Sequence, residues 1–185
     1  MDLIVKTKSN EVNDAGIVTI AVNAIGNLDS HKQISATGSF DKTLVENFKR
    51  TRHFLNHDRD ILIGCPLSGK EENKLIVMKS EMNLDIEKGR DVYSFYKLFQ
   101  KNEMTLEHSV GVEPVKFDKS DKRIVLEWRM WEFSTLYDWA SNPNTPLLDL
   151  KQLQYKDDPQ RSINFIQDAL RLKFSDKILE TYENY

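Results

Sequence analysis

The chain contains a single cysteine, Cys65, among its 185 residues. One thiol cannot form an internal disulfide, and it cannot supply the paired ligands of a CxxC zinc knuckle. This cysteine usage is typical of a protein from a reducing compartment. We therefore expect the protein to act in a cytoplasm, and we expect no metal and no other cofactor.

Long apolar runs and an excess of basic charge are also missing. The first ten residues, MDLIVKTKSN, lack the apolar core of a signal peptide, and no later run is long enough to span a bilayer. The 26 Lys and Arg residues are balanced by 29 Asp and Glu residues, which gives a net charge of −3. The sequence therefore predicts neither a nucleic-acid partner nor a membrane partner.

What is present is typical of a soluble globular protein, with 39% hydrophobic and 30% charged residues. The length suits one compact domain with an appendage. The polar, proline-containing stretch SNPNTP marks the boundary, so we expect a domain at 1–146 and a helical tail at 147–185. In that tail, residues 158–184 predict an amphipathic helix, which would either pack on its own domain or bind a partner. Its apolar face would consist of Ile163, Ile166, Leu170 and Phe174.

Runs of β-branched and aromatic residues dominate the predicted domain. Two helices are expected, one at about 39–50 with Ser39 as its N-cap and one at 91–102. Strands are expected at 17–25, 52–58, 61–69, 74–84, 106–118 and 123–136. Several strands with only two short helices between them favour a mainly β fold, an antiparallel barrel or sandwich with surface helices.

The stretch EHSVGV places His108 directly beside Ser109, which suggests a nucleophile and its base. Side chains alternate across a strand, however, so Ser109 and Gly111 lie on one face while His108 lies on the other. Gly111 leaves space beside the Ser109 hydroxyl where another chain could approach. Ser109 is therefore a candidate nucleophile or an ordinary surface serine, and its base has to come from elsewhere.

The strand LEWRMWEFS carries a carboxylate in an apolar pattern. By alternation Glu132 shares a face with Trp128 and Met130. Removing an unpaired carboxylate from water costs roughly several kcal/mol. If Glu132 is buried, it should therefore have a hydrogen-bonding or cationic partner such as an imidazole. The alternative is that the strand frays at Trp131 and Glu132 reaches water.

Histidine is scarce, with only His31, His53, His57 and His108. His53 and His57 are four residues apart, but the segment between them reads as a strand, which disfavours a two-histidine zinc site on a helix. His31 lies in a polar loop. His57 precedes an apolar strand, and at the edge of such a strand a base could reach into a cleft.

Four short motifs occur in an order that resembles the prohead serine proteases of tailed bacteriophages. They are TGSF leading into a helix, LNHDRDILIG with its His-Asp and later Ile-Gly, HSVGVEPVKF, and EWRMWEFSTL, which is similar to a Leu-Trp-Glu-Val-Ser-Leu pattern of the family. Together they cover the chain from about residue 16 to about 146. Each motif is short, and the weight of the resemblance comes from their order.

The resemblance implies that Ser109 is the nucleophile, His57 the general base and Glu132 the residue that orients the imidazole. A serine hydroxyl is a weak nucleophile until a base removes its proton, and a carboxylate on the far ring nitrogen fixes the tautomer of that base. Candidates for the oxyanion hole are backbone N–H groups near Gly111 or a nearby arginine.

The same resemblance implies a closed antiparallel β-barrel of the herpesvirus maturation-protease type, and by analogy a homodimer. Two features depart from the family pattern. Val112 stands where an aromatic residue is common, and the stretch 137–146 is longer and more polar than usual. Both concern the substrate cleft and leave the three catalytic positions unaffected.

The expected function is that of a serine endopeptidase that cuts scaffold and capsid proteins, and itself, inside the assembling procapsid in the host cytoplasm. An alternative is a barrel with a degenerate site that acts as a scaffold- or capsid-binding module. A third, a small-ligand β-barrel protein, does not explain a carboxylate in the apolar pattern of Trp128 and Met130.

Overall fold

The computed structural model describes residues 16–142 and 144–148. The predicted tail from residue 149 onward, including the amphipathic pattern at 158–184, lies outside the described residues. Within the described part, the chain is mainly β with few helices. Neither of its α-helices is long and apolar enough to cross a membrane.

The strands follow the apolar runs of the sequence closely. They are β1 (Ile17–Ala24), β2 (Ile34–Ser35), β3 (Arg52–Leu55), β4 (Asp58–Glu72), β5 (Leu75–Met82), β6 (Glu107–Phe117) and β7 (Ile124–Leu136). The two-residue strand β2 falls in a stretch that the sequence pattern presents as a loop. The two predicted strands at 52–58 and 61–69 become β3 and the long β4, with the break at the Asn56–His57 turn instead of at Arg59 and Asp60.

Two α-helices and one 3₁₀ turn connect the strands. They are α1 (Asp41–Glu46), the 3₁₀ turn Phe48–Arg50, and α2 (Glu87–Lys101). The predicted cap at Ser39 is wrong, because α1 begins after Phe40 and has no side-chain cap. Within residues 16–142 and 144–148, the buried Ser39 hydroxyl finds no hydrogen-bond partner. Packing against β7 and β4, where Thr43 Oγ1 accepts the Met130 N–H at 2.9 Å, holds this short helix instead.

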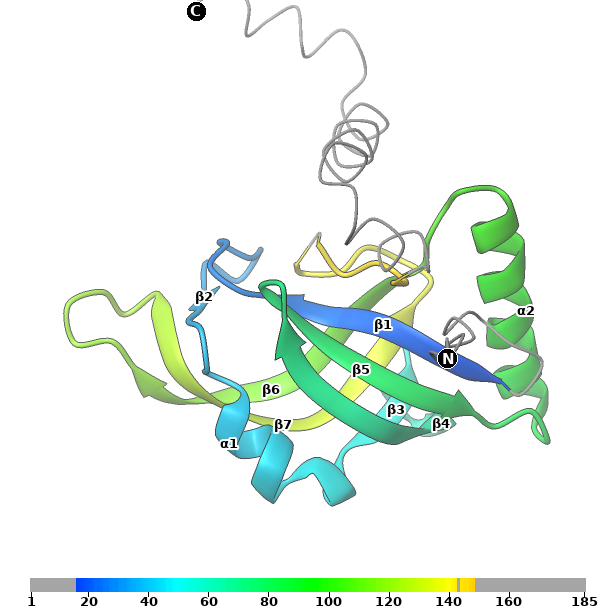
Figure 1. Cartoon of the computed structure of the whole chain (residues 1–185), viewed down its shortest axis with the longest axis horizontal. Helices are drawn as coiled ribbons and strands as arrows, with labels where there is room; N and C mark the ends of the chain where they lie inside the picture. The colour runs from blue at the N-terminus through cyan, green and yellow to red at the C-terminus, as the bar shows by residue number, and fades with distance from the viewer. Residues whose placement is uncertain (1–15, 143, 149–185) are drawn as a thin grey trace, which may run out of the picture. The chain divides into compact units, whose positions relative to one another are not determined.

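All seven strands belong to one sheet, which curls strongly (Figure 1). Its hydrogen-bonded order is β1-β5-β4-β3-β7-β2, and β6 also pairs with β7. The sheet is mixed, because β3 and β2 both run parallel to β7 while the other pairs are antiparallel. Parallel strands need a long connection, and more than 65 residues separate both β2 and β3 from β7 in the chain. The expectation of a wholly antiparallel sheet is therefore wrong.

A short segment after β7 lies between β1 and β6. Pro146 accepts a hydrogen bond from the Ala21 N–H at 3.0 Å, and the Leu148 N–H donates to Thr19. On the other side, the Thr145 carbonyl accepts from His108 Nδ1 at 2.7 Å. Leu147 forms a bridge with Ile20, so residues just beyond the predicted boundary at 146 still contact β1.

The core lies inside the curl and is built from all of the long strands and both helices. Its largest fully buried apolar side chains are Tyr96, Phe40, Phe133, Ile20, Ile63, Ile76, Met78 and Met130. β7 contributes side chains to this core along its length. The alternation of its side chains therefore decides which of its polar residues point away from the core.

Candidate active site

A tight turn between β3 and β4 presents His57. Leu55 and Asp58 are paired, so the hairpin loop consists of Asn56 and His57 alone. Both have positive φ angles, 53° and 59°, as a two-residue turn of type I′ requires. The Asn56 N–H donates to the Thr135 carbonyl, and the Tyr137 N–H donates to Asn56 Oδ1, which tie the turn to the end of β7. His57 therefore lies in a fixed turn, and not at the edge of a strand as the sequence suggested.

A bulge in β7 reverses the predicted face of Glu132. Gly111 pairs with Glu132, but the next residue of β6, Val112, pairs with Met130, so Trp131 is an extra residue in β7. Paired residues share a face, and neighbours on one strand do not, so Glu132 and Met130 point to opposite sides. The prediction that Glu132 lies in line with Met130 is wrong. Beyond the bulge Phe133 takes the core position.

Glu132 is buried nonetheless, with 3% of its surface exposed, and its two carboxylate oxygens are both engaged. Oε1 lies 2.8 Å from His57 Nδ1, and Oε2 accepts the hydroxyl proton of Ser134 at 2.7 Å. The predicted hydrogen-bonding partner of this carboxylate is thus the imidazole of His57. The alternative in which Glu132 reaches water is excluded.

The pair fixes the tautomer of His57. An ionised carboxylate can only accept, so Nδ1 carries a proton, and in the neutral ring Nε2 then keeps a free electron pair. Among the described residues no hydrogen bond engages Nε2, and the His57 side chain is 41% exposed. An imidazole in this state can take a proton from a group that approaches from solvent.

Gly111 provides the space for this pair. A Cβ atom built on Gly111 would lie 2.0 Å from Glu132 Oε1 and 2.7 Å from its Cδ, so the carboxylate occupies the volume of the missing side chain. The sequence indicated space beside Ser109 for an approaching chain. The space exists, but Glu132 fills it, and only glycine is compatible with this arrangement.

Ser109 lies on the same outward face, two residues before Gly111 on β6. Its partner in the register is Ser134, whose hydroxyl contacts both Glu132 and the His57 N–H. Directly paired residues of an antiparallel ladder have Cα atoms about 4.5–5.5 Å apart. Ser109 is therefore one cross-strand step from the residue that links the other two predicted site residues.

No hydrogen bond joins Ser109 to His57, and the described residues offer the Ser109 hydroxyl no other side-chain partner. Ser109 is half-buried and so is reachable from solvent. The structure thus brings His57 and Glu132 into direct contact. Ser109 lies beside them but does not bond to the His57 ring. Catalytic hydrogen bonds of an unliganded site are often long and tighten only with substrate.

Two other histidines belong to the core. His53 bonds through Nδ1 to Ser80 and through Nε2 to Thr135, at 2.9 Å each. His108 bonds through Nε2 to the Tyr96 hydroxyl at 2.8 Å and stacks on the Tyr96 ring. Burial lowers the pKa of His53 to about 3 and that of His108 to about 4, so both rings are neutral. The prediction that His108 is turned away from Ser109 is confirmed.

His31 forms a second surface contact with a serine, Nε2 to Ser141 Oγ at 3.0 Å. In the described part of the chain no carboxylate bonds to its other ring nitrogen. His53 and Ser80 form another such pair, but both are fully buried. Of the serine and histidine combinations in the described ranges, only the one around His57 includes a bonded carboxylate.

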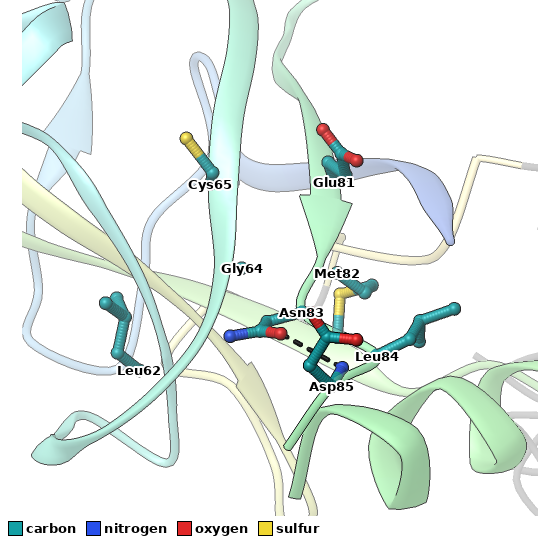
Figure 2. Close-up of a pocket in the computed structure, with 8 residues that line it drawn as sticks. All are labelled: Leu62, Gly64, Cys65, Glu81, Met82, Asn83, Leu84 and Asp85. Atoms are coloured by element: carbon teal, nitrogen blue, oxygen red, sulfur yellow. Dashed lines mark hydrogen bonds between the residues drawn. The ribbon is translucent and has the colours of Figure 1, made fainter. Parts of the chain in front are cut away.

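A pocket of about 410 Å³ lies elsewhere, between β4, the end of β5 and the start of the segment that leads to α2 (Figure 2). Its lining includes the exposed Cys65 and the acidic residues Glu81 and Asp85. None of the three predicted site residues lines it. Within residues 16–142 and 144–148, no group of three or more His, Cys, Asp and Glu side chains is arranged to hold a metal ion.

Ser134 contacts both His57 and Glu132 in the candidate site, and the sequence did not single it out. It lies in the quoted motif WEFS, but alternation alone gave no reason to separate it from other polar strand residues. Its contacts depend on the bulge at Trp131, and a bulge leaves no clear mark in a single sequence.

Comparisons with protein-family models, with curated proteins and with solved structures found no match to this chain. Support for the candidate site therefore comes only from the contacts within this chain.

Proposed function

We propose that this chain is a serine endopeptidase of the prohead-protease type, with Ser109 as nucleophile, His57 as general base and Glu132 as the orienting carboxylate. The observation that carries the proposal is the 2.8 Å contact between Glu132 and His57 on the face that also presents Ser109. A buried carboxylate bonded to a half-exposed imidazole supplies two of the three parts of a catalytic triad, and Ser109 lies beside them as the third.

In the proposed reaction the Ser109 hydroxyl attacks the peptide carbonyl while His57 Nε2 takes its proton. Glu132 stabilises the imidazolium that forms, because its carboxylate stays on Nδ1. The imidazolium then protonates the leaving amine, and water repeats the sequence to release the acyl group from Ser109. Backbone N–H groups of β6 near Gly111 are the candidates for the oxyanion hole.

The proposed substrates are the scaffold and major capsid proteins of a tailed phage, cut inside the assembling procapsid, together with the chain itself. The proposed barrel is closed, and the segment from Thr145 to Leu148 supports this because it bonds to β1 on one side and to β6 on the other. A homodimer in the host cytoplasm completes the proposal by analogy with the herpesvirus maturation proteases.

The test is co-expression with the cognate scaffold and capsid proteins, with processing followed by gel and mass spectrometry. Ser109→Ala and His57→Ala should each reduce processing by about a thousandfold or more. The matched controls are Ser141→Ala and His31→Ala, which remove the other surface serine and histidine pair and should leave processing unchanged. Processing that continues in the Ser109→Ala variant would show that Ser109 is not the nucleophile.

A second candidate function is that of a scaffold- or capsid-binding module with a degenerate site. The observation in its favour is that no hydrogen bond joins Ser109 to His57. A fluorophosphonate probe separates the two candidates when it is applied to the wild-type oligomer. Labelling that requires both Ser109 and His57 supports the endopeptidase, and its absence from the fully assembled wild-type protein supports the binding module.

A further inference from the structure

Ser134 makes two contacts that connect the parts of the candidate active site. Its hydroxyl donates to Glu132 Oε2 at 2.7 Å, and its oxygen accepts the main-chain N–H of His57 at 3.1 Å. One contact holds the carboxylate, and the other holds the turn that carries the imidazole. Both partners of the 2.8 Å His57–Glu132 bond are therefore fixed to a single atom.

The state of this hydroxyl is determined by its bonding. Its one proton is committed to the ionised carboxylate of Glu132, so it can only accept from His57. Ser134 is fully buried, with none of its surface exposed. It is thus unable to serve as a nucleophile itself, although it lies directly opposite Ser109 in the register.

The contact with the His57 N–H matters because of the backbone of the turn. His57 has a φ of 59°, a conformation that few non-glycine residues adopt without support. The turn is also tied to β7 through Asn56 and through the bond from the His57 ring to Glu132. Without the Ser134 oxygen, the His57 N–H would lose its partner and the ring would no longer be held at one distance from Glu132.

We propose that Ser134 is a positioning residue of the active site, which locks the His57 turn and the Glu132 carboxylate in mutual register. The inference rests on the proposed function for its consequence in catalysis, but the geometry that it describes is independent of substrate. Ser134 acts through His57 and Glu132 and does not touch the reacting atoms.

Two measurements on Ser134→Ala test the proposal. Proton NMR reads the low-field signal of the His57 Nδ1–H, which reports its bond to Glu132 without any substrate. We expect this signal to broaden or move upfield in the variant, and the rate of fluorophosphonate labelling at Ser109 to fall about tenfold, the effect of one lost hydrogen bond to a charged group. Ser134→Thr, which keeps the hydroxyl, should restore both.

The matched control is Ser80→Ala, which removes the hydroxyl of another fully buried strand serine that bonds to a histidine. It should leave the His57 signal and the labelling rate unchanged. The comparison therefore separates the effect of Ser134 from the general effect of losing a buried hydroxyl. An unchanged signal and rate in Ser134→Ala, or equal losses in Ser80→Ala, would overturn the proposal.

A measurement on the wild-type protein covers the case in which the variants fail to fold. The His57 amide should be protected from hydrogen exchange by its bond to Ser134, and fast exchange at this amide in the folded protein would contradict the proposal. If Ser109 never labels but the His57 signal still depends on Ser134, the proposed function fails while the positioning role stands.

Discussion

Replacing Gly111 with alanine should disable the candidate site by a displacement that the structure allows us to calculate. The new Cβ would lie 2.0 Å from Glu132 Oε1, whereas ordinary contact begins at 3.4 Å, so the oxygen must retreat by the difference, about 1.4 Å. That movement is half of the 2.8 Å distance between Oε1 and His57 Nδ1. A misplacement of about 1 Å costs about a hundredfold in rate, so we expect at least that loss.

The assay is the rate of fluorophosphonate labelling at Ser109, followed by mass spectrometry alongside thermal unfolding. The backbone of Gly111 is not in the left-handed region, so alanine itself adds no backbone strain. The control is Gly69→Ala in β4, where the added Cβ meets the flexible Met78 and Leu44 side chains 2.7 and 2.9 Å away. A labelling rate in Gly111→Ala equal to that of the wild type would refute the role of the Glu132–His57 contact.

Three further predictions concern the carboxylate and the buried histidines. Glu132→Gln removes the charge that stabilises the imidazolium, and labelling at Ser109 should fall by about a thousandfold while circular dichroism stays unchanged. Since burial lowers the folded pKa values of His53 and His108 to about 3 and 4, the unfolded state binds more protons below about pH 6.5. Stability is therefore lost as the pH falls, by about 4 kcal/mol for the two groups together between pH 7 and pH 5, and urea unfolding at each pH measures it; a flat profile would contradict the neutral, buried rings. Tyr96→Phe leaves His108 and Thr135 without a hydroxyl partner and should lower the free energy of unfolding by about 1–3 kcal/mol in the same assay, whereas an unchanged value would show that water replaces the hydroxyl.

Much of this arrangement follows from strand periodicity. The alternation of β6 correctly separates Ser109 from His108, because neighbouring residues of a strand point to opposite faces of the sheet and only one face of β6 is packed against the core. Five of the six predicted strands match β1, β3, β5, β6 and β7 closely, since long β-branched runs have few other stable conformations. A polar partner for Glu132 was one of two alternatives that the sequence left open, and the contact with His57 agrees with it.

The remaining features depend on tertiary contacts that a single sequence does not encode locally. Alternation placed Glu132 beside Met130, and the extra residue at Trp131 reverses this because pairing with β6 admits a bulge there. Asn56 and His57 were interpreted as parts of a strand, whereas their left-handed backbone forms a hairpin turn that bonds to β7. The role of Ser134 depends on both features, which explains why periodicity did not reveal it.

The parallel pairing of β3 with β7 has a consequence for when the site can exist. Phe54 pairs with Ser134 and Arg52 with Glu132, so the contact between His57 and its carboxylate joins residues 75 positions apart in the chain. Such long-range pairings form late in folding, because the entropy of closing a large loop must be paid before the contact stabilises it. A nascent chain that has not yet synthesised β7 cannot hold an oriented imidazole. Under the proposed function, a chain in which β7 has not yet paired with β3 is inactive, and cleavage begins only after β7 has joined the sheet.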